Sequence, residues 1–217
     1  MNEFEDFARQ QQLMEKRHRC FGDASGLYGY RFDLDNGQVP QMEHARAYVS
    51  RWNDMSQQNV GLLFWGKPGN GKTFVAGCIA NALLEMESMH APSVVMTTFG
   101  TILNKLPGMA VSDKEWYLGS FQTCDLLVLD DFGMERQTDY AREQVFNIID
   151  GRYLARKPMI ITTNLSLTEL KHPCDMVEQR IFDRVLEMCV PVCFDGESLR
   201  RGKAQEKIQM YRDLLRK

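Results

Sequence analysis

The stretch GLLFWGKPGNGKTF, residues 61–74, decides the fold of this chain. An apolar run breaks there into glycines and closes on a lysine and a threonine, so that residues 66–73 match G-x-x-x-x-G-K-[ST] at every fixed position. The glycines let the backbone curl around phosphate oxygens, and the helix that follows offers them its positive N-terminus. A glycine-rich turn without a ligand is the alternative. We predict a nucleoside triphosphate site, because a strand precedes the loop and a helix follows it.

The loop residues have separate expected roles. Lys72 would reach the β and γ phosphates, and Thr73 would ligate magnesium. The nucleotide-binding residues that we predict here are Gly66, Lys67, Pro68, Gly69, Asn70, Gly71, Lys72, Thr73 and Phe74.

Hydrolysis needs a second, acidic motif, and CDLLVLDD at residues 124–131 supplies one. Asp130 would hold Mg²⁺ directly or through water, while Asp131 would polarise the attacking water. The alternative is that the two aspartates cap the next helix. Two carboxylates so close to a triphosphate would be costly without a cation, so the motif implies magnesium as well as ATP.

Short unbroken apolar runs alternate with helical patterns along the rest of the chain. Such runs are typical of strands buried on both faces of a parallel sheet, and the helical stretches are long enough for crossovers. The predicted strands are Val60–Trp65, Val94–Thr97, Leu126–Leu129, Met159–Thr162 and Val190–Phe194. The predicted helices are Met42–Met55, Lys72–Met86, Phe99–Leu106, Tyr140–Leu154 and Met176–Met188. This pattern predicts an α/β domain, with a flexible insert from Pro107 to Lys114.

The fourth predicted strand ends in Thr162, Thr163 and Asn164. A polar residue at that tip can sense the γ-phosphate and position water. We assign this role to Asn164, with Thr163 as the second choice. The alternative is that Asn164 only begins a turn.

Composition limits the function classes. The formal net charge of -3 over 217 residues gives no bulk argument for nucleic-acid binding. The six cysteines form no CxxC pair, which is typical of reduced thiols in cytosol. The sequence shows neither a signal peptide nor an apolar run of about 18 residues. We therefore expect a cytoplasmic protein without a membrane segment, in which residues 1–58 form an N-terminal extension and 59–217 the ATPase domain.

Taken together, the phosphate loop, the Asp-Asp and Thr-Thr-Asn strand ends and QRIFDR at residues 179–184 resemble AAA+ ATPases. LLVLDDFG at 126–133 and FDGESLRR at 194–201 make the resemblance closer to the DnaC/IstB-like group of helicase loaders and transposition helper ATPases. The match runs from about residue 31 to 201. It implies a three-layer α/β/α P-loop NTPase with a parallel five-stranded sheet of order 5-1-4-3-2 and no large separate lid domain. It also implies ATP bound between neighbouring subunits.

The resemblance also implies roles for further residues. Arg184 falls where the group has its arginine finger, and Arg180 lies one turn earlier on the same face. The alternative is that these are surface arginines paired with Glu178 or Glu187. Arg200 matches the second sensor arginine, with Arg201 beside it as the obvious misassignment. Tyr140 lies where related loaders contact DNA, although it could instead be a packed tyrosine at a helix start.

The resemblance predicts a helicase-loader-like ATPase of DNA replication that forms a nucleotide-dependent homo-oligomer and acts on a replicative helicase and single-stranded DNA. The alternatives are an IstB-like transposition helper and a nucleotide-dependent interaction switch that does not hydrolyse ATP. Loaders commonly carry a longer segment before the ATPase domain that grips the helicase. Here the predicted extension before the ATPase domain is residues 1–58, which is shorter. This difference leaves the helicase partner open, but not the ATPase assignment.

Overall fold

The computed structural model describes residues 3–86, 91–133, 138–196, 198, 199, 208, 211, 212 and 215. The strands are β1 (Gly61–Trp65), β2 (Val94–Thr98), β3 (Leu126–Phe132), β4 (Met159–Thr163) and β5 (Cys189–Cys193). The α-helices are α1 (Glu3–Phe21), α2 (Met42–Ser50), α3 (Trp52–Gln57), α4 (Lys72–Leu84), α5 (Phe99–Lys105), α6 (Val111–Thr123), α7 (Asp139–Ala155), α8 (Leu167–Lys171) and α9 (Met176–Met188). Short 3₁₀ turns lie at Ser25–Gly29, Phe32–Leu34 and Leu106–Gly108.

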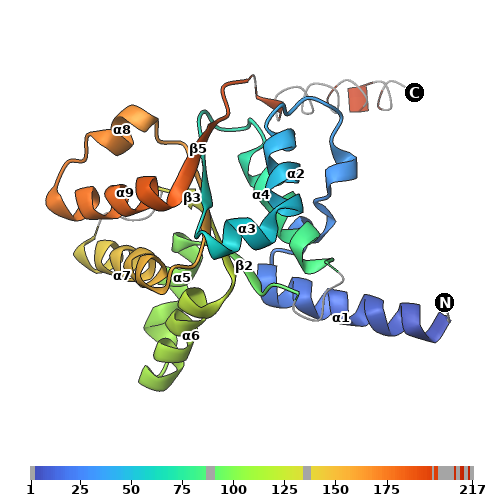
Figure 1. Ribbon diagram of the computed structural model, residues 1–217, viewed down its shortest axis with the longest axis horizontal. Coiled ribbons are helices and arrows are strands. Elements are labelled where there is room, and N and C mark those ends of the chain that lie inside the picture. The colour runs from blue at the N-terminus through green and yellow to red at the C-terminus, as the bar shows by residue number, and fades with distance from the viewer. Residues whose placement is uncertain are drawn as a thin grey trace.

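The five strands form one parallel sheet in the order β2-β3-β4-β1-β5, which confirms the predicted order read from the other edge. Helices cover both faces (Figure 1). One core cluster contains residues of helices α1 through α4 and alternate strand residues such as Leu62 and Val128. The other cluster contains residues of helices α5 through α9 and the neighbouring strand residues Leu63 and Leu129. The chain crosses from β1 to the far strand β2 and later returns beside β1, so the carboxyl end of β1 is a switch point where α/β sheets bind ligands.

Two predicted elements differ from the structure. The insert at residues 107–114 is a 3₁₀ turn followed by the first turn of α6, rather than a flexible segment. The helix predicted over residues 42–55 is two helices, because Arg51 leaves helical geometry at φ −110°. Ala45, Tyr48 and Trp52 form the buried face of these two helices.

The end of α1 is part of the core. Arg17 is 6% exposed, donates through Nε to Asn81 Oδ1 at 2.9 Å and forms an ion pair with Glu85, both on or beside α4. Cys20 packs against the outer strand β2, and burial raises the pKa of its thiol. The division at residue 58 stays a prediction. Buried residues from Cys20 to Trp52 share one core cluster with α4 and the strands.

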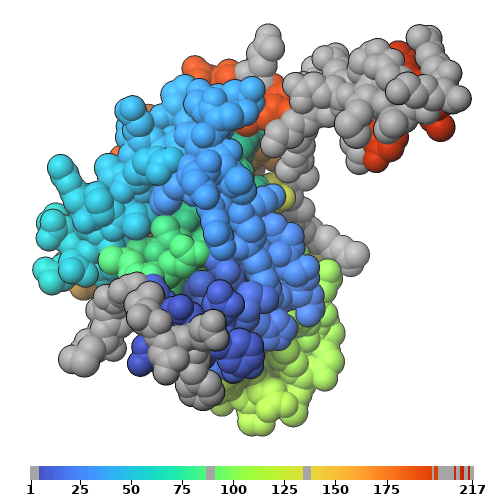
Figure 2. Space-filling model, turned by 90° about the vertical axis from the view of Figure 1, so that its right-hand side faces the viewer, coloured from blue at the N-terminus to red at the C-terminus, as the bar shows by residue number. Residues whose placement is uncertain are grey.

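The outer half of α1 lies away from this core, with Phe7 and Met14 exposed (Figure 1). Its other end lies on the same face of the molecule as α6, and the two helices line one groove along β2 (Figure 2). The opposite edge strand, β5, carries Pro191, whose missing N–H protects a sheet edge from further pairing. Within the described ranges, no helix has the length and apolarity needed to cross a membrane.

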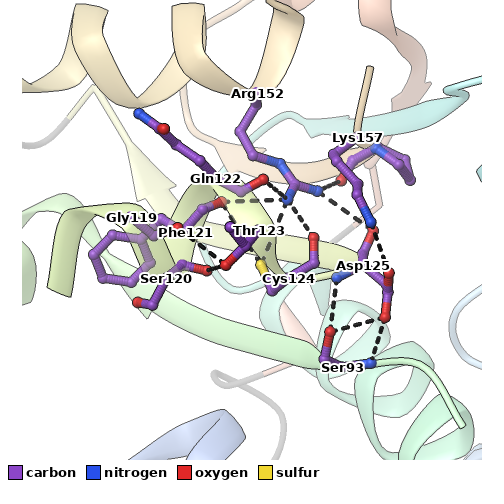
Figure 3. Close-up of polar contacts among 11 residues, drawn as sticks. Ser93, Gly119, Ser120, Phe121, Gln122, Thr123, Cys124, Asp125, Arg152 and Lys157 are labelled. Atoms are coloured by element: carbon purple, nitrogen blue, oxygen red, sulfur yellow. Dashed lines mark hydrogen bonds and ion pairs between the residues drawn. The ribbon is translucent and has the colours of Figure 1, made fainter. Parts of the chain in front are cut away.

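A buried arginine ties α6 and α7 to the amino end of the sheet (Figure 3). Arg152 is fully buried, and its guanidinium donates to the carbonyls of Phe121, Gln122, Cys124 and Pro158. The last carbonyls of a helix have no partner within it, so Arg152 acts as the cap that ends α6. Burial lowers the pKa of Arg152.

A neighbouring ion pair completes this polar cluster. Lys157 Nζ lies 2.8 Å from Asp125 Oδ1, and the other oxygen of Asp125 accepts from the N–H and hydroxyl of Ser93. Burial alone would raise the pKa of Asp125, but these contacts outweigh it and hold that pKa below its usual value. The cluster therefore joins the starts of β2, β3 and β4.

Arg152→Met should lower the free energy of unfolding by about 3 kcal/mol or more, because several buried carbonyls lose their donor and each such loss costs about 1–3 kcal/mol. Urea unfolding measures the change. The control is Arg19→Met, whose side chain is 76% exposed, with an expected change within about 0.5 kcal/mol. Equal stability of the two variants would contradict the capping role.

Candidate functional site

The glycine loop lies between β1 and α4, as the motif requires. Lys72 is 5% exposed, and its Nζ donates to the carbonyls of Gly66 (2.6 Å) and Lys67 (2.8 Å). This contact holds the ammonium group inside the curl of the loop, at the N-terminus of a 13-residue helix. Helix dipole, loop N–H groups and lysine charge therefore favour an anion at the same place.

Two glycines of the loop are required by close contact as well as by backbone geometry. Gly66 has φ +133°, and a Cβ there would lie 2.3 Å from the carbonyl oxygen of Phe194. Gly69 has φ +88°, and its Cβ would lie 2.2 Å from Ser198 Oγ. Both neighbours belong to the segment after β5, so the loop packs directly against the chain that leads to the C-terminus.

The side chain of Asn70 strengthens this packing. It is 6% exposed, and its Nδ2 donates to the carbonyls of Phe194 (3.0 Å) and Gly196 (2.6 Å). The Leu199 N–H also donates to the Gly69 carbonyl at 3.0 Å. Asn70 therefore ties the loop to the segment before Arg200. Arg200 and Arg201 lie outside the described residues.

The acidic pair lies at the carboxyl end of β3, next to the loop. Asp130 is 9% exposed, and its Oδ1 accepts hydrogen bonds from Thr73 Oγ1 (2.9 Å) and Thr162 Oγ1 (2.6 Å). Burial raises the pKa of Asp130 and the Asp131 carboxylate adds to that rise, while both threonine hydroxyls and Lys72 lower it. Asp131 is exposed at the rim and belongs to the strand, so the pair does not cap α7, whose cap is Thr138.

This donor set fits magnesium. Thr73 and Asp130 are the predicted ligands, and their oxygens meet at hydrogen-bond distance beside the loop. Mg²⁺ is usually bound by one or two carboxylates together with substrate phosphates and water, rather than by an all-protein cage. The described residues contain no group of three or more His, Cys, Asp or Glu that could hold a metal ion. When bound, the ion would neutralise charge on the β and γ phosphates.

Asn164 directly follows β4, whose last residue Thr163 pairs with Trp65 at the end of β1. The half-buried Asn164 therefore lies one residue beyond the strand end beside the loop. Thr163 is fully buried and its hydroxyl donates to the Phe132 carbonyl (2.7 Å), which leaves Asn164 as the better candidate for sensing phosphate. Sequence reasoning assigned no role to Thr162, and the available signal was a hydroxyl residue at the end of an apolar run.

Arg184 lies on α9 against α7. Its Nη2 is 2.5 Å from Asp150 Oδ1, and its guanidinium stacks 4.9 Å from the ring centre of Phe146. The partner is thus Asp150 rather than Glu178 or Glu187. Arg180, one turn earlier, is exposed. Tyr140 is 49% exposed on the first turn of α7, so it is not a packed core residue.

A parallel five-stranded sheet with a phosphate loop after β1, an acidic pair after β3 and a polar residue after β4 defines a P-loop ATP-binding protein of the AAA+ class. The family model of IstB-like ATP binding proteins matches residues 4–207, so the chain belongs to that family.

Curated relatives support this membership. The chain is 27% identical over 206 residues to the replicative helicase loader DnaI of Bacillus subtilis, an alignment that covers 90% of this chain and 65% of DnaI. It is also 27% identical over 175 residues to the replicative helicase loader DnaC of Escherichia coli, covering 79% and 67%. The chain therefore spans about two thirds of the length of these relatives.

A solved structure gives the same relationship. The crystal structure of the DnaC helicase loader superposes with a TM-score of 0.65 at 26% identity, over 79% of this chain and all of that one. The fold and the family are therefore the ones that the sequence motifs predicted.

Lys72→Ala should abolish binding of a fluorescent ATP analogue, because it removes the charge that pairs with the β and γ phosphates. Lys171→Ala is the control for the loss of a lysine charge. Lys171 is exposed at the end of α8, outside the phosphate loop, and its substitution should cost no more than about 0.5 kcal/mol of binding energy. Undiminished binding by the Lys72 variant would refute the assignment of the phosphate loop.

Proposed function

We propose that this protein is a Mg²⁺-dependent ATPase that loads or remodels a replicative helicase on single-stranded DNA, in the cytoplasm. The observation that carries the ATPase is the contact of Thr73 with Asp130, which brings the phosphate loop and the acidic pair to one place. The similarity to DnaI and DnaC supports the helicase as partner. The exposed ring of Tyr140 is available to stack on a base.

The residues of the site have separate chemical roles. Lys72 and the loop N–H groups bind and orient the phosphates, while Thr73 and Asp130 hold the ion. Asp131 is exposed at the rim of the site, where it can accept a proton from the attacking water. Asn164 orients that water or the γ-phosphate from the neighbouring strand. The exposed Asp131 favours hydrolysis over a switch that only binds nucleotide.

The second candidate is an IstB-like transposition helper, which the family model favours. The two functions differ in the nucleic acid that they need. A helicase loader should release phosphate faster with single-stranded DNA than with duplex, and should co-purify with a ring helicase. Stimulation by duplex alone, together with co-purification of a transposase, would favour the helper.

Asp131→Asn should leave ATP binding nearly intact and lower turnover by about 10²–10⁴, because the water loses its general base while the phosphate contacts remain. Phosphate release and analogue binding, measured on the same preparation, separate the two effects. Unchanged hydrolysis would show that a residue other than Asp131 is the general base. Glu135, the next candidate in the sequence, lies outside the described residues.

Arg184 is proposed to complete the site of a neighbouring subunit in a nucleotide-dependent homo-oligomer. Within one chain the guanidinium is paired with Asp150, so this pair has to open for Arg184 to reach a neighbour. Arg184→Ala should bind ATP normally but hydrolyse it about 10³–10⁵ times more slowly. Asp150→Asn is the matched control, because it breaks the same ion pair from the other side and should retain turnover.

A mixing experiment tests action between subunits. When Arg184→Ala and Asp131→Asn chains are combined, an intact Asp131 site can meet an intact Arg184, and part of the activity should return. Turnover per wild-type subunit should also rise with protein concentration or with added single-stranded DNA. A mixture that co-assembles by light scattering yet stays inactive would refute the proposed role of Arg184 in the neighbouring site.

A further inference from the structure

Thr162 is one of two buried threonines at the end of β4. The three residues before it in β4, Met159 to Ile161, are apolar and fully buried, and Thr162 is itself fully buried. A buried hydroxyl without a hydrogen bond costs free energy, so its contacts show what keeps it there. Thr162 Oγ1 donates to Asp130 Oδ1 at 2.6 Å and accepts from the Asp131 backbone N–H at 3.0 Å. One hydroxyl group therefore holds both members of the acidic pair.

The backbone at this point is irregular. Leu129 pairs with Ile161 and Phe132 with Thr163, so Asp130 and Asp131 together lie opposite Thr162. Asp131 has φ +54°, a left-handed conformation that costs a residue other than glycine about 1–2 kcal/mol. A bulge of two residues against one re-aims the side chains that follow it. Here it lets Asp130 lie buried against Thr73 while Asp131 is exposed at the rim.

Thr162 supplies the hydrogen-bond acceptor that the bulge removes from the pairing of β3 with β4. The N–H of Asp131 would lie unpaired beside a buried strand without an acceptor, and the Thr162 hydroxyl provides one. The same hydroxyl donates to the Asp130 oxygen that also accepts from Thr73. Its two contacts thus set the direction of one carboxylate and the backbone that carries the other.

We propose that Thr162 is a positioning residue, which holds Asp130 for the metal and the Asp131 turn for the attacking water. The inference rests on the proposed ATPase function. Thr162 acts through its two neighbours, because its side chain is fully buried and its hydroxyl contacts Asp130 and the Asp131 N–H. Partners of this kind behind a metal ligand are worth about 10–100-fold in metal affinity or activity.

Two substitutions at the same position separate the hydroxyl from the shape of the side chain. Thr162→Val keeps the β-branched shape that suits a strand and loses the hydroxyl, while Thr162→Ser keeps the hydroxyl and loses a methyl group. The Val variant should lose about 10–100-fold in kcat with unchanged binding of the ATP analogue, and should need more Mg²⁺ for half-maximal rate. The Ser variant should behave like the wild type.

Two further measurements do not depend on turnover. Mn²⁺ affinity in the presence of ADP, followed by electron paramagnetic resonance, should fall about 10-fold in Thr162→Val and be retained in Thr162→Ser. Amide hydrogen exchange of Asp131 in the nucleotide-free protein should be slow in the wild type and the Ser variant, and faster in the Val variant, because only the last lacks the acceptor.

Urea unfolding shows whether each variant is folded. If Thr162→Val does not fold, the comparison is made between Thr162→Ala and Thr162→Ser, which both lack the methyl group and differ only in the hydroxyl.

The outcomes distinguish this inference from the function on which it rests. A wild-type protein that binds ATP but does not hydrolyse it contradicts the proposed ATPase. An active wild type with an equally active Thr162→Val contradicts only the role of Thr162. Equal losses in the Val and Ser variants would also overturn it, because they would assign the effect to packing of the methyl group.

Discussion

A single carboxylate oxygen organises the site. Asp130 Oδ1 accepts hydrogen bonds from Thr73 on α4 and Thr162 on β4, which lie 57 and 32 residues away in the sequence. A buried carboxylate is unfavourable unless it is hydrogen-bonded or paired with a cation, so the two hydroxyls and the nearby Lys72 make this arrangement possible. The position of the phosphate loop relative to the sheet depends on the same contacts. These contacts therefore join the loop, the predicted metal ligand and the strand ends into one unit.

The sequence was sufficient for the sheet and the loop, and insufficient for some helices. Strands buried on both faces give unbroken apolar runs, and the loop motif has fixed spacing, so β1 and its neighbours were predictable. Helix α6 was harder to predict, because its apolar residues are divided between two faces. Val111 and Trp116 are exposed, whereas Tyr117, Leu118 and Phe121 pack against the core. The end of this helix depends on Arg152, which lies in another helix.

The predicted site residues were identifiable by type and spacing, but their contacts were not. Thr162 faces the acidic pair because β3 bulges against β4, and a bulge is a property of the paired strands rather than of either sequence. Arg184 likewise meets Asp150 because α7 and α9 pack together, whereas the sequence alone suggested nearby glutamates on its own helix. Long-range register and packing supply this information, and local patterns cannot.

Asn70 shows how binding at one end of the site can reach another part of the chain. It occupies a variable position of the motif, so the motif by itself assigns it no role. Its amide nevertheless holds the carbonyls of Phe194 and Gly196, and the Leu199 N–H holds the Gly69 carbonyl. Buried amide contacts of this kind are costly to break, so they hold the loop and this segment together. The loop is thus tied by hydrogen bonds to the segment after β5 in this chain.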